Sequence, residues 1–166
     1  MATSDGAMVN AVTEKYPLRG KLLVADEPFT RGTEAQQGPV PGEVWIESRL
    51  LPALDLQLGD TVYIGAAEFV LSKVLIKEPD QSGFYNLGPR VLMHWDDVPA
   101  TQVVQAGSRL NYRLLLSGDE AALTEMGSWV KPQLKKQYRW LGVKQGNPQI
   151  GQALQRAESF LLLGGL

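Results

Sequence analysis

The tetrapeptide "HWDD" at 94–97 contains the residues best suited to chemistry. His94 is the single histidine of the sequence, and Asp96 and Asp97 follow it within three positions. An imidazole beside carboxylates can exchange a proton or help to bind a metal ion. A transition-metal site usually takes three or four ligands, and the sequence has no second histidine and no cysteine to complete one. We therefore favour a structural interpretation, in which a strand ends here and an aspartate caps the following helix.

Two serines lie beside glycines and are candidate nucleophiles. Ser108 follows Gly107 and Ser117 precedes Gly118, but neither lies in a G-x-S-x-G elbow that would support a triad with His94. The glycines also form neither of the two phosphate-binding motifs, G-x-x-x-x-G-K-[ST] and G-x-G-x-x-G. The sequence thus predicts no catalytic, cofactor-binding or metal-binding residue, no cofactor, and a protein that is not itself an enzyme.

A basic stretch with aromatic residues runs from 131 to 144, "KPQLKKQYRWLGVK". It carries five basic residues and no acidic one, with Tyr138 and Trp140 among them. Such a stretch can form a patch for nucleic acid or phospholipid headgroups, or it can be the solvated end of a helix followed by a strand, which we favour. The net charge of −2 provides no overall basic field, so we do not expect nucleic acid as a partner.

Length and composition are those of an ordinary folding domain. With 166 residues, 44% of them hydrophobic and 20% charged, the chain can form one domain, or one domain with two small lobes, around a core of its own. The first twelve residues do not have the pattern of a signal peptide. No window reaches the roughly 18 to 20 apolar residues of a membrane-spanning helix, so the sequence as given is expected to be soluble.

The first half of the sequence predicts strands joined by turns. We expect two extended pieces within 8–25 that meet at Pro17, followed by an exposed loop at 26–42 that is rich in proline and glycine. A strand at 44–46 should then lead into a short helix that Ser48 caps. Next, Gly59 marks a turn before a β-hairpin, whose two strands are expected at 61–64 and from 68 onward.

The second half predicts a mixture of strands and helices. A strand at 90–95 precedes a helix that is capped by Asp96 or Asp97 and ends at Gly107. Alternating apolar residues then predict a half-buried strand over 108–118. A helix over 119–137 has acidic residues at its start and Lys135 and Lys136 at its end, with Pro132 as a possible break. The final helix is expected to begin at Asn147.

The sequence closes on an apolar run, "FLLLGGL" at 160–166. It fits a buried terminal helix, an amphipathic segment at a membrane interface, or the first turns of a membrane helix. Gly164 and Gly165 are unfavourable inside a soluble helix and common in membrane helices, which weakly favours the last interpretation.

Four stretches in order resemble a known family. They are "YPLRGKL" (16–22), "GPVPGEVWIESRLLPALDLQLGDTVYIGAAEFVLSKVL" (38–75), "EPDQSGFYNLGPRVLMHWDDVPATQVVQAGSRLNYRLLL" (78–116) and "QALQRAESFLLL" (152–163). Together they resemble the extracytoplasmic domain between the first two membrane helices of MacB/FtsX-type ABC transporter permeases, the MacB-like periplasmic core domain, and especially the YbbP-like subgroup.

The resemblance implies an α+β fold, with a mixed α/β porter-like lobe and a smaller β-rich lobe. Residues 16–88 would form the β-rich lobe and 89–150 the α/β lobe, while 151–166 would be a stalk helix that leads into the second membrane helix. Relatives have a further strand-helix portion before "YPLRG". Residues 1–15 would therefore be a partial N-terminal segment or foreign to the natural protein, and the α/β lobe would be truncated at its N-terminus.

The resemblance further implies a non-catalytic domain on the periplasmic side of the bacterial inner membrane. A separate cytoplasmic subunit would hydrolyse ATP, and the motion would reach this domain through the membrane helices to export or extract a lipophilic substrate such as a lipid. The alternative is an interaction module that recruits or regulates a periplasmic enzyme or adaptor, with 26–42 and 131–144 as its candidate surfaces.

Overall fold

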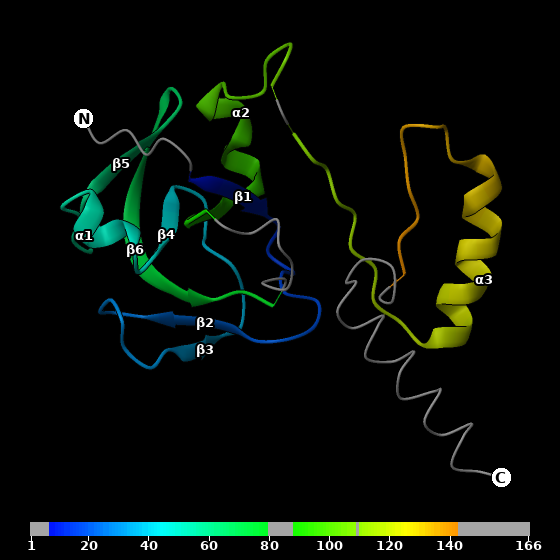
Figure 1. Ribbon diagram of the computed structural model, residues 1–166, viewed down its shortest axis with the longest axis horizontal. Coiled ribbons are helices and arrows are strands. Elements are labelled where there is room, and N and C mark those ends of the chain that lie inside the picture. The colour runs from blue at the N-terminus through cyan, green and yellow to red at the C-terminus, as the bar shows by residue number, and fades with distance from the viewer. Residues whose placement is uncertain (1–6, 80–87, 109, 143–166) are drawn as a thin grey trace, which may run out of the picture. The chain divides into compact units, whose positions relative to one another are not determined.

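A computed structural model describes residues 7–79, 88–108 and 110–142 of the chain (Figure 1). The chain divides into two compact units. The first, here called the sheet unit, comprises residues 1–81 and 86–115. The second, here called the helical unit, comprises residues 82–85 and 116–166.

The sheet unit is built on a mixed sheet whose strand order is β1-β7-β4-β6-β2-β3, with β5 pairing with β6. The pairs β1/β7 and β4/β6 are parallel and the other pairs are antiparallel. A mixed sheet with helices confirms the predicted α+β class. The strands are β1 (Met8–Val12), β2 (Leu22–Ala25), β3 (Thr33–Ala35), β4 (Glu43–Glu47), β5 (Thr61–Ile64), β6 (Ala67–Lys77) and β7 (Arg90–His94).

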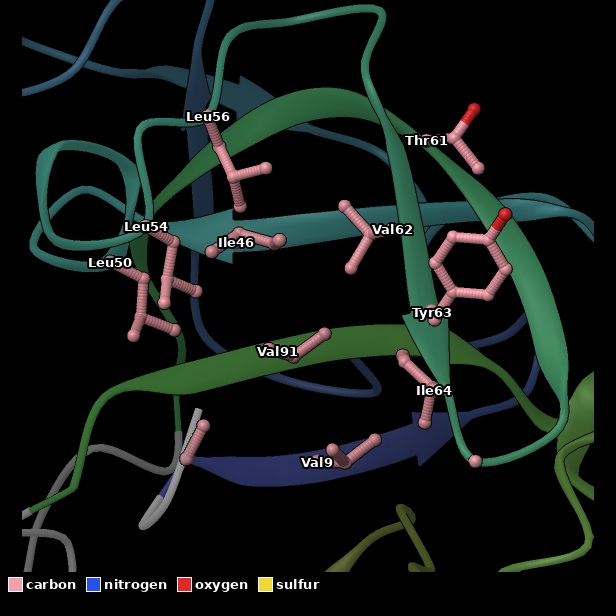
Figure 2. A pocket seen from close by; sticks show the side chains of 12 residues that line it. Val9, Ile46, Leu50, Leu54, Leu56, Thr61, Val62, Tyr63, Ile64 and Val91 are labelled. Carbon is pink, nitrogen blue, oxygen red and sulfur yellow. The ribbon is translucent and has the colours of Figure 1, made fainter. Parts of the chain in front are cut away.

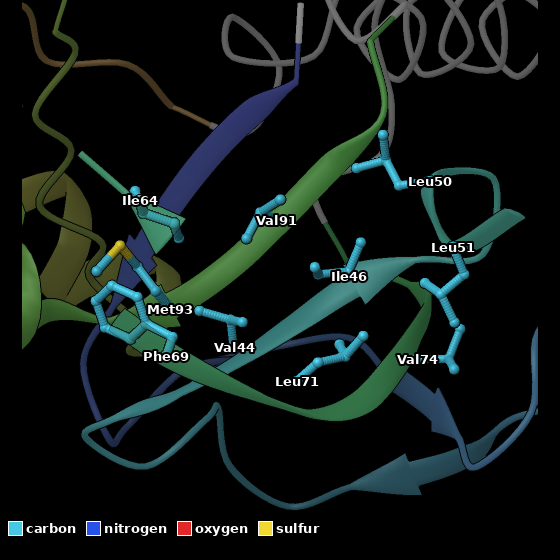
Figure 3. Close-up of a cluster of buried hydrophobic side chains, with 10 residues drawn as sticks. All are labelled: Val44, Ile46, Leu50, Leu51, Ile64, Phe69, Leu71, Val74, Val91 and Met93. Atoms are coloured by element: carbon cyan, nitrogen blue, oxygen red, sulfur yellow. The ribbon is translucent and has the colours of Figure 1, made fainter. Parts of the chain in front are cut away.

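Alternating side chains supply one hydrophobic cluster to each face of the sheet. On β4, Val44 and Ile46 join the larger cluster, shown in Figure 3, whereas Trp45 points to the other face. On β7, Val91 and Met93 join the larger cluster and Leu92 the smaller one. Strands buried on both faces read as continuous apolar runs, which is why "VWI" and "VLM" are so hydrophobic. These central strands carry the core.

The predicted hairpin is confirmed, and its turn is tightly packed. Gly65 has a φ of +59°, and a Cβ atom there would lie 2.0 Å from the carbonyl oxygen of Thr101. The neighbouring Ala66 N–H donates to that same oxygen at 2.8 Å. Only glycine allows this approach, which joins the β5–β6 turn to the end of helix α2 (Val98–Thr101).

The predicted cap at Ser48 is wrong. Helix α1 (Leu50–Ala53) is preceded by Arg49, and no side chain caps its N-terminus. The buried Ser48 hydroxyl instead accepts a hydrogen bond from the N–H of Phe29, 3.3 Å away. A serine hydroxyl can satisfy a loop N–H as well as a helix N–H, and here the distant loop takes it. That loop, predicted to be irregular over 26–42, also contains β3.

The helix that follows β7 is shorter than predicted. A 3₁₀ turn, η1 (Trp95–Asp97), comes first, and α2 then ends where Gln102 adopts a left-handed conformation with φ of 54°. Gly107 lies beyond the helix, in a separate turn with φ of +91°. The half-buried strand predicted over 108–118 is wrong as well, because 110–118 is irregular and exposed. Alternation alone does not make a strand where no partner strand is available.

The helical unit contains α3 (Glu120–Val130) and the 3₁₀ turn η2 (Lys131–Gln133). The Asp119 carboxylate accepts the N–H of Ala122 at 2.9 Å and so caps α3. Pro132 lies in η2, directly after α3, which confirms the predicted break. The helix predicted through 137 is too long, because α3 ends at Val130 and Lys135 and Lys136 lie in a turn beyond it. The helix predicted from Asn147 and the apolar tail lie outside the described residues, and no helix in the described ranges is long and apolar enough to span a bilayer.

Candidate functional site

The "HWDD" residues form a structural cap. The Nδ1 atom of His94 accepts a hydrogen bond from the N–H of Asp96 at 3.2 Å. The Asp96 carboxylate lies 3.8 Å from the same nitrogen, too far for a hydrogen bond. Asp97 occupies the N-cap position of α2, but its carboxylate makes no capping hydrogen bond and instead accepts the N–H of Gly42 at 2.9 Å. The predicted N-cap position is therefore confirmed for Asp97, but the expected side-chain cap is wrong, since the side chain that caps a turn here is that of His94, at the start of η1.

Both candidate serines lie outside the helices and strands. The Ser108 hydroxyl accepts the N–H of Gln105 at 3.1 Å and donates to the carbonyl of Val103 at 2.8 Å, so it closes a turn. Ser117 lies in the irregular stretch before α3. Among the described residues, no group of three or more histidine, aspartate or glutamate side chains could hold a metal ion.

A cavity of about 220 Å³ opens beneath β5 in the sheet unit (Figure 2). Aliphatic side chains from β1, β4, α1, β5 and β7 dominate its walls, with Thr61 and Tyr63 among the polar ones. Its volume is below the roughly 300 to 1,000 Å³ of pockets for drug-sized ligands. It is lined by Ala7, Val9, Ile46, Leu50, Leu54, Leu56, Thr61, Val62, Tyr63, Ile64, Gly65 and Val91.

Tyr63 belongs to this cavity and is also paired with Glu68 across the β5–β6 hairpin. A side-chain hydrogen bond with Glu68, together with that carboxylate's negative charge, raises the pKa of the Tyr63 hydroxyl above its ordinary value. The tyrosine therefore stays neutral at physiological pH and serves as a hydrogen-bonding group, not as a base.

A buried ion pair joins two strands that are not neighbours. Arg90, the first residue of β7, lies 2.7 Å from the Glu78 carboxylate just after β6, and both side chains are less than 5% exposed. Between these strands lies β4, whose Glu47 accepts the N–H of Arg90 at 3.2 Å. Glu47 also pairs with Arg49 at 2.6 Å. Among the described residues, every buried side-chain nitrogen and oxygen has a partner, so these charges satisfy one another at the ends of three central strands.

One loop presents a large apolar side chain to solvent. Phe29 is 69% exposed and has a φ of 60°, a conformation rare for a bulky residue. The loop is anchored on both sides, because Asp26 pairs with Lys73 of β6 and the Phe29 N–H donates to Ser48. The sequence marks loop 26–42 as a candidate surface but gives no signal for Phe29, whose exposure depends on those distant anchors.

The basic stretch folds back along α3. The Tyr138 N–H donates to the carbonyl of Lys135 at 2.9 Å, which closes a turn after η2. Beyond it the Trp140 ring lies against Gly127, where an added Cβ would come within 3.1 Å of the ring atoms. The expected strand after the helix does not form, since the described residues 134–142 are irregular.

Comparison with known proteins gives one family. No protein-family model matches the chain, and no solved structure matches it significantly. The chain is 36% identical over 166 residues to a protein of Escherichia coli K12 named the uncharacterized ABC transporter permease YbbP. The match covers 99% of this chain and 20% of YbbP, so the chain spans about one fifth of that relative's length. Identity at this level over nearly the whole chain supports the ABC transporter permease family for this sequence.

Proposed function

We propose that this chain is a non-catalytic, periplasm-facing domain of an ABC transporter permease in the inner membrane. The observation that carries the proposal is the 36% identity to a segment that makes up 20% of YbbP. A segment of that size is a domain rather than a whole transporter. The candidate chemical residues support a non-catalytic role, because His94 and Ser108 are engaged in closing local backbone structure.

In this proposal a separate cytoplasmic subunit hydrolyses ATP, and the domain moves with the membrane helices to which it is connected. The sheet unit suits that role, since two hydrophobic clusters and the buried Arg90–Glu78 pair give it a rigid core. The substrate is proposed to be lipophilic. The division into a β-rich lobe at 16–88 and an α/β lobe at 89–150, with a stalk at 151–166, stays part of the proposal.

Orientation can be tested with a single introduced cysteine, because these 166 residues have none and any cysteine elsewhere in the protein can first be replaced by serine. In the membrane-embedded protein that contains this sequence, Gln36→Cys places a thiol at an exposed position after β3. A membrane-impermeant maleimide should label it in intact spheroplasts. A matched Leu71→Cys protein, with its thiol in the core, should label only after denaturation. Labelling of Gln36→Cys only after cell lysis would place the domain in the cytoplasm and contradict the proposal.

A second candidate function, a docking module for a periplasmic enzyme or adaptor, is favoured by Phe29. A solvent-facing phenylalanine on an anchored, strained loop is costly unless a partner covers it, and aromatic side chains commonly dominate binding energy at interfaces. Crosslinking in intact cells, with a reagent that reaches the periplasm, should join the native protein to a partner. Phe29→Ala should abolish that capture, whereas Phe69→Ala changes the core and serves only to show the effect of unfolding. Equal capture by native and Phe29→Ala chains would exclude this loop.

A further inference from the structure

The end of α3 forms a concentrated positive surface, here called the basic tip. It consists of the exposed residues Trp129, Lys131, Lys135, Lys136, Tyr138 and Arg139. Four of these six side chains are cationic, and no acidic residue occurs between Glu125 and the end of the described chain at 142. None of the four cations forms an ion pair with another described residue, in contrast to Lys21, Arg49, Lys73 and Arg90 of the sheet unit.

Local structure holds these charges together. The turn that follows η2 brings the chain back, and the contact of Trp140 with Gly127 fixes the returning segment along α3. Lys135 and Lys136 therefore lie within the turn itself. The same fold leaves two large amphipathic aromatics in solvent, with Trp129 67% exposed and Tyr138 59% exposed.

Charge is separated along the helix. Asp119 and Glu120 lie at the N-terminal end of α3 and the basic tip follows its C-terminal end. Eleven helical residues place the two ends about 16 Å apart, further than the Debye length of about 8 Å at physiological salt. The two carboxylates at the acidic end therefore do not neutralise the tip. Glu125, halfway along α3, is one negative charge against the four cations, so the tip stays positive and can face an anionic surface while the acidic end faces away.

We propose that the basic tip binds the anionic phospholipid headgroups of a membrane surface. Lysine and arginine stems can lie on apolar surface while their charges reach phosphate, and tryptophan and tyrosine are enriched at the headgroup level of bilayers. The tip supplies both kinds of side chain. The choice of a membrane rests on the proposed function, which places the domain beside a bilayer. A nucleic acid is less well matched, because the chain as a whole is negatively charged.

The test is co-sedimentation of the 166-residue chain with vesicles of phosphatidylcholine and phosphatidylglycerol at 3:1, compared with phosphatidylcholine alone. We expect binding to the anionic vesicles that decreases with added salt. Each lysine near an anionic surface contributes about fivefold to affinity, so Lys135→Gln with Lys136→Gln should weaken binding by roughly 25-fold. Trp129 emission should shift to the blue on binding, and Trp129→Phe should remove that shift.

The matched control is Lys15→Gln with Lys77→Gln, which removes the same charge from exposed positions of the sheet unit. It should bind like the native chain. Circular dichroism of all variants checks that the fold is retained. Equal binding to neutral vesicles, equal loss in the two double variants, or tighter binding of a single-stranded oligonucleotide with the same lysine dependence would each overturn the proposal. None of these results affects the cysteine-labelling test, because labelling of Gln36→Cys measures the orientation of the domain and does not involve the basic tip.

Discussion

The two units differ sharply in how they bury their residues. In the described ranges, all buried hydrophobic side chains lie between Tyr16 and Met93, within the sheet unit. In the described part of the helical unit, from 116 to 142, Gly127 is the one buried residue. The sheet unit thus has its own core, whereas α3 leaves Met126 and Trp129 in solvent.

Because of this difference, the residues that stabilise the fold and the residues proposed to bind a membrane lie in different units. An isolated helix of eleven residues is marginal in water, so α3 depends on packing such as that of Trp140 against Gly127. Because so few side chains are buried within residues 116–142, surface residues there can change at little cost. We therefore expect core and ion-pair substitutions to act on stability and substitutions in the basic tip to act on binding.

The largest expected effect is that of Arg90→Met. Removing the guanidinium leaves the Glu78 carboxylate buried and without its partner, which should cost about 4 kcal/mol of unfolding free energy. Urea unfolding monitored by circular dichroism measures the loss. The double variant Arg90→Met with Glu78→Leu should recover most of it, because apolar residues of similar volume can replace a buried pair. A loss below about 1 kcal/mol in the single variant would show that water reaches the pair.

A smaller loss is expected for Leu71→Ala in the larger hydrophobic cluster. Leu71 is fully buried, and truncation of such a leucine usually costs about 3 kcal/mol through lost burial and a residual cavity. The matched Leu141→Ala variant removes the same atoms from a side chain that is 63% exposed. It should change the unfolding free energy by less than about 0.5 kcal/mol. Similar losses at the two positions would contradict the contrast between the units.

The smallest effect on overall stability is expected for Gly127→Val. A side chain at this position must displace the Trp140 ring, so Trp140 emission should shift to the red. The unfolding free energy of the sheet unit should change by less than about 0.5 kcal/mol, because the substitution lies outside its core. Gly142→Ala, where no atom lies within 4 Å of the added Cβ, is the control and should leave the emission unchanged.

Several elements could be predicted because their signals are local. Apolar runs identified β4, β6 and β7, Gly59 and Gly65 identified turns that need positive φ, and Pro132 identified the end of α3. The strand predicted over 108–118 failed, since its alternation has the right period but the structure gives it no partner. Alternation shows that a segment can form a strand, but it does not show whether the fold supplies a partner strand.

The candidate sites also combine features that the sequence shows with features that only folding creates. The basic stretch can be identified from the sequence, but the exposure of its side chains and its turn depend on the contact between Trp140 and Gly127. The cavity could not be predicted, because its walls come from five separate elements. The sequence signal for Glu78 is its position directly after an apolar strand. A glutamate that is buried at such a position is expected to have a charged partner.

By itself, the sequence determined the α+β class, most strand and turn positions, the start of α3 and the break at Pro132, and a resemblance to ABC transporter permeases. Periodicity, glycine and proline act over a few residues, so they can be read along the chain. Only the tertiary structure decided that Ser48 serves a distant loop, that His94 and not an aspartate caps a turn, and that Arg90 meets Glu78. Each of these roles is set by a hydrogen-bond partner or charge brought near by folding, and a buried polar group takes whichever partner the fold supplies.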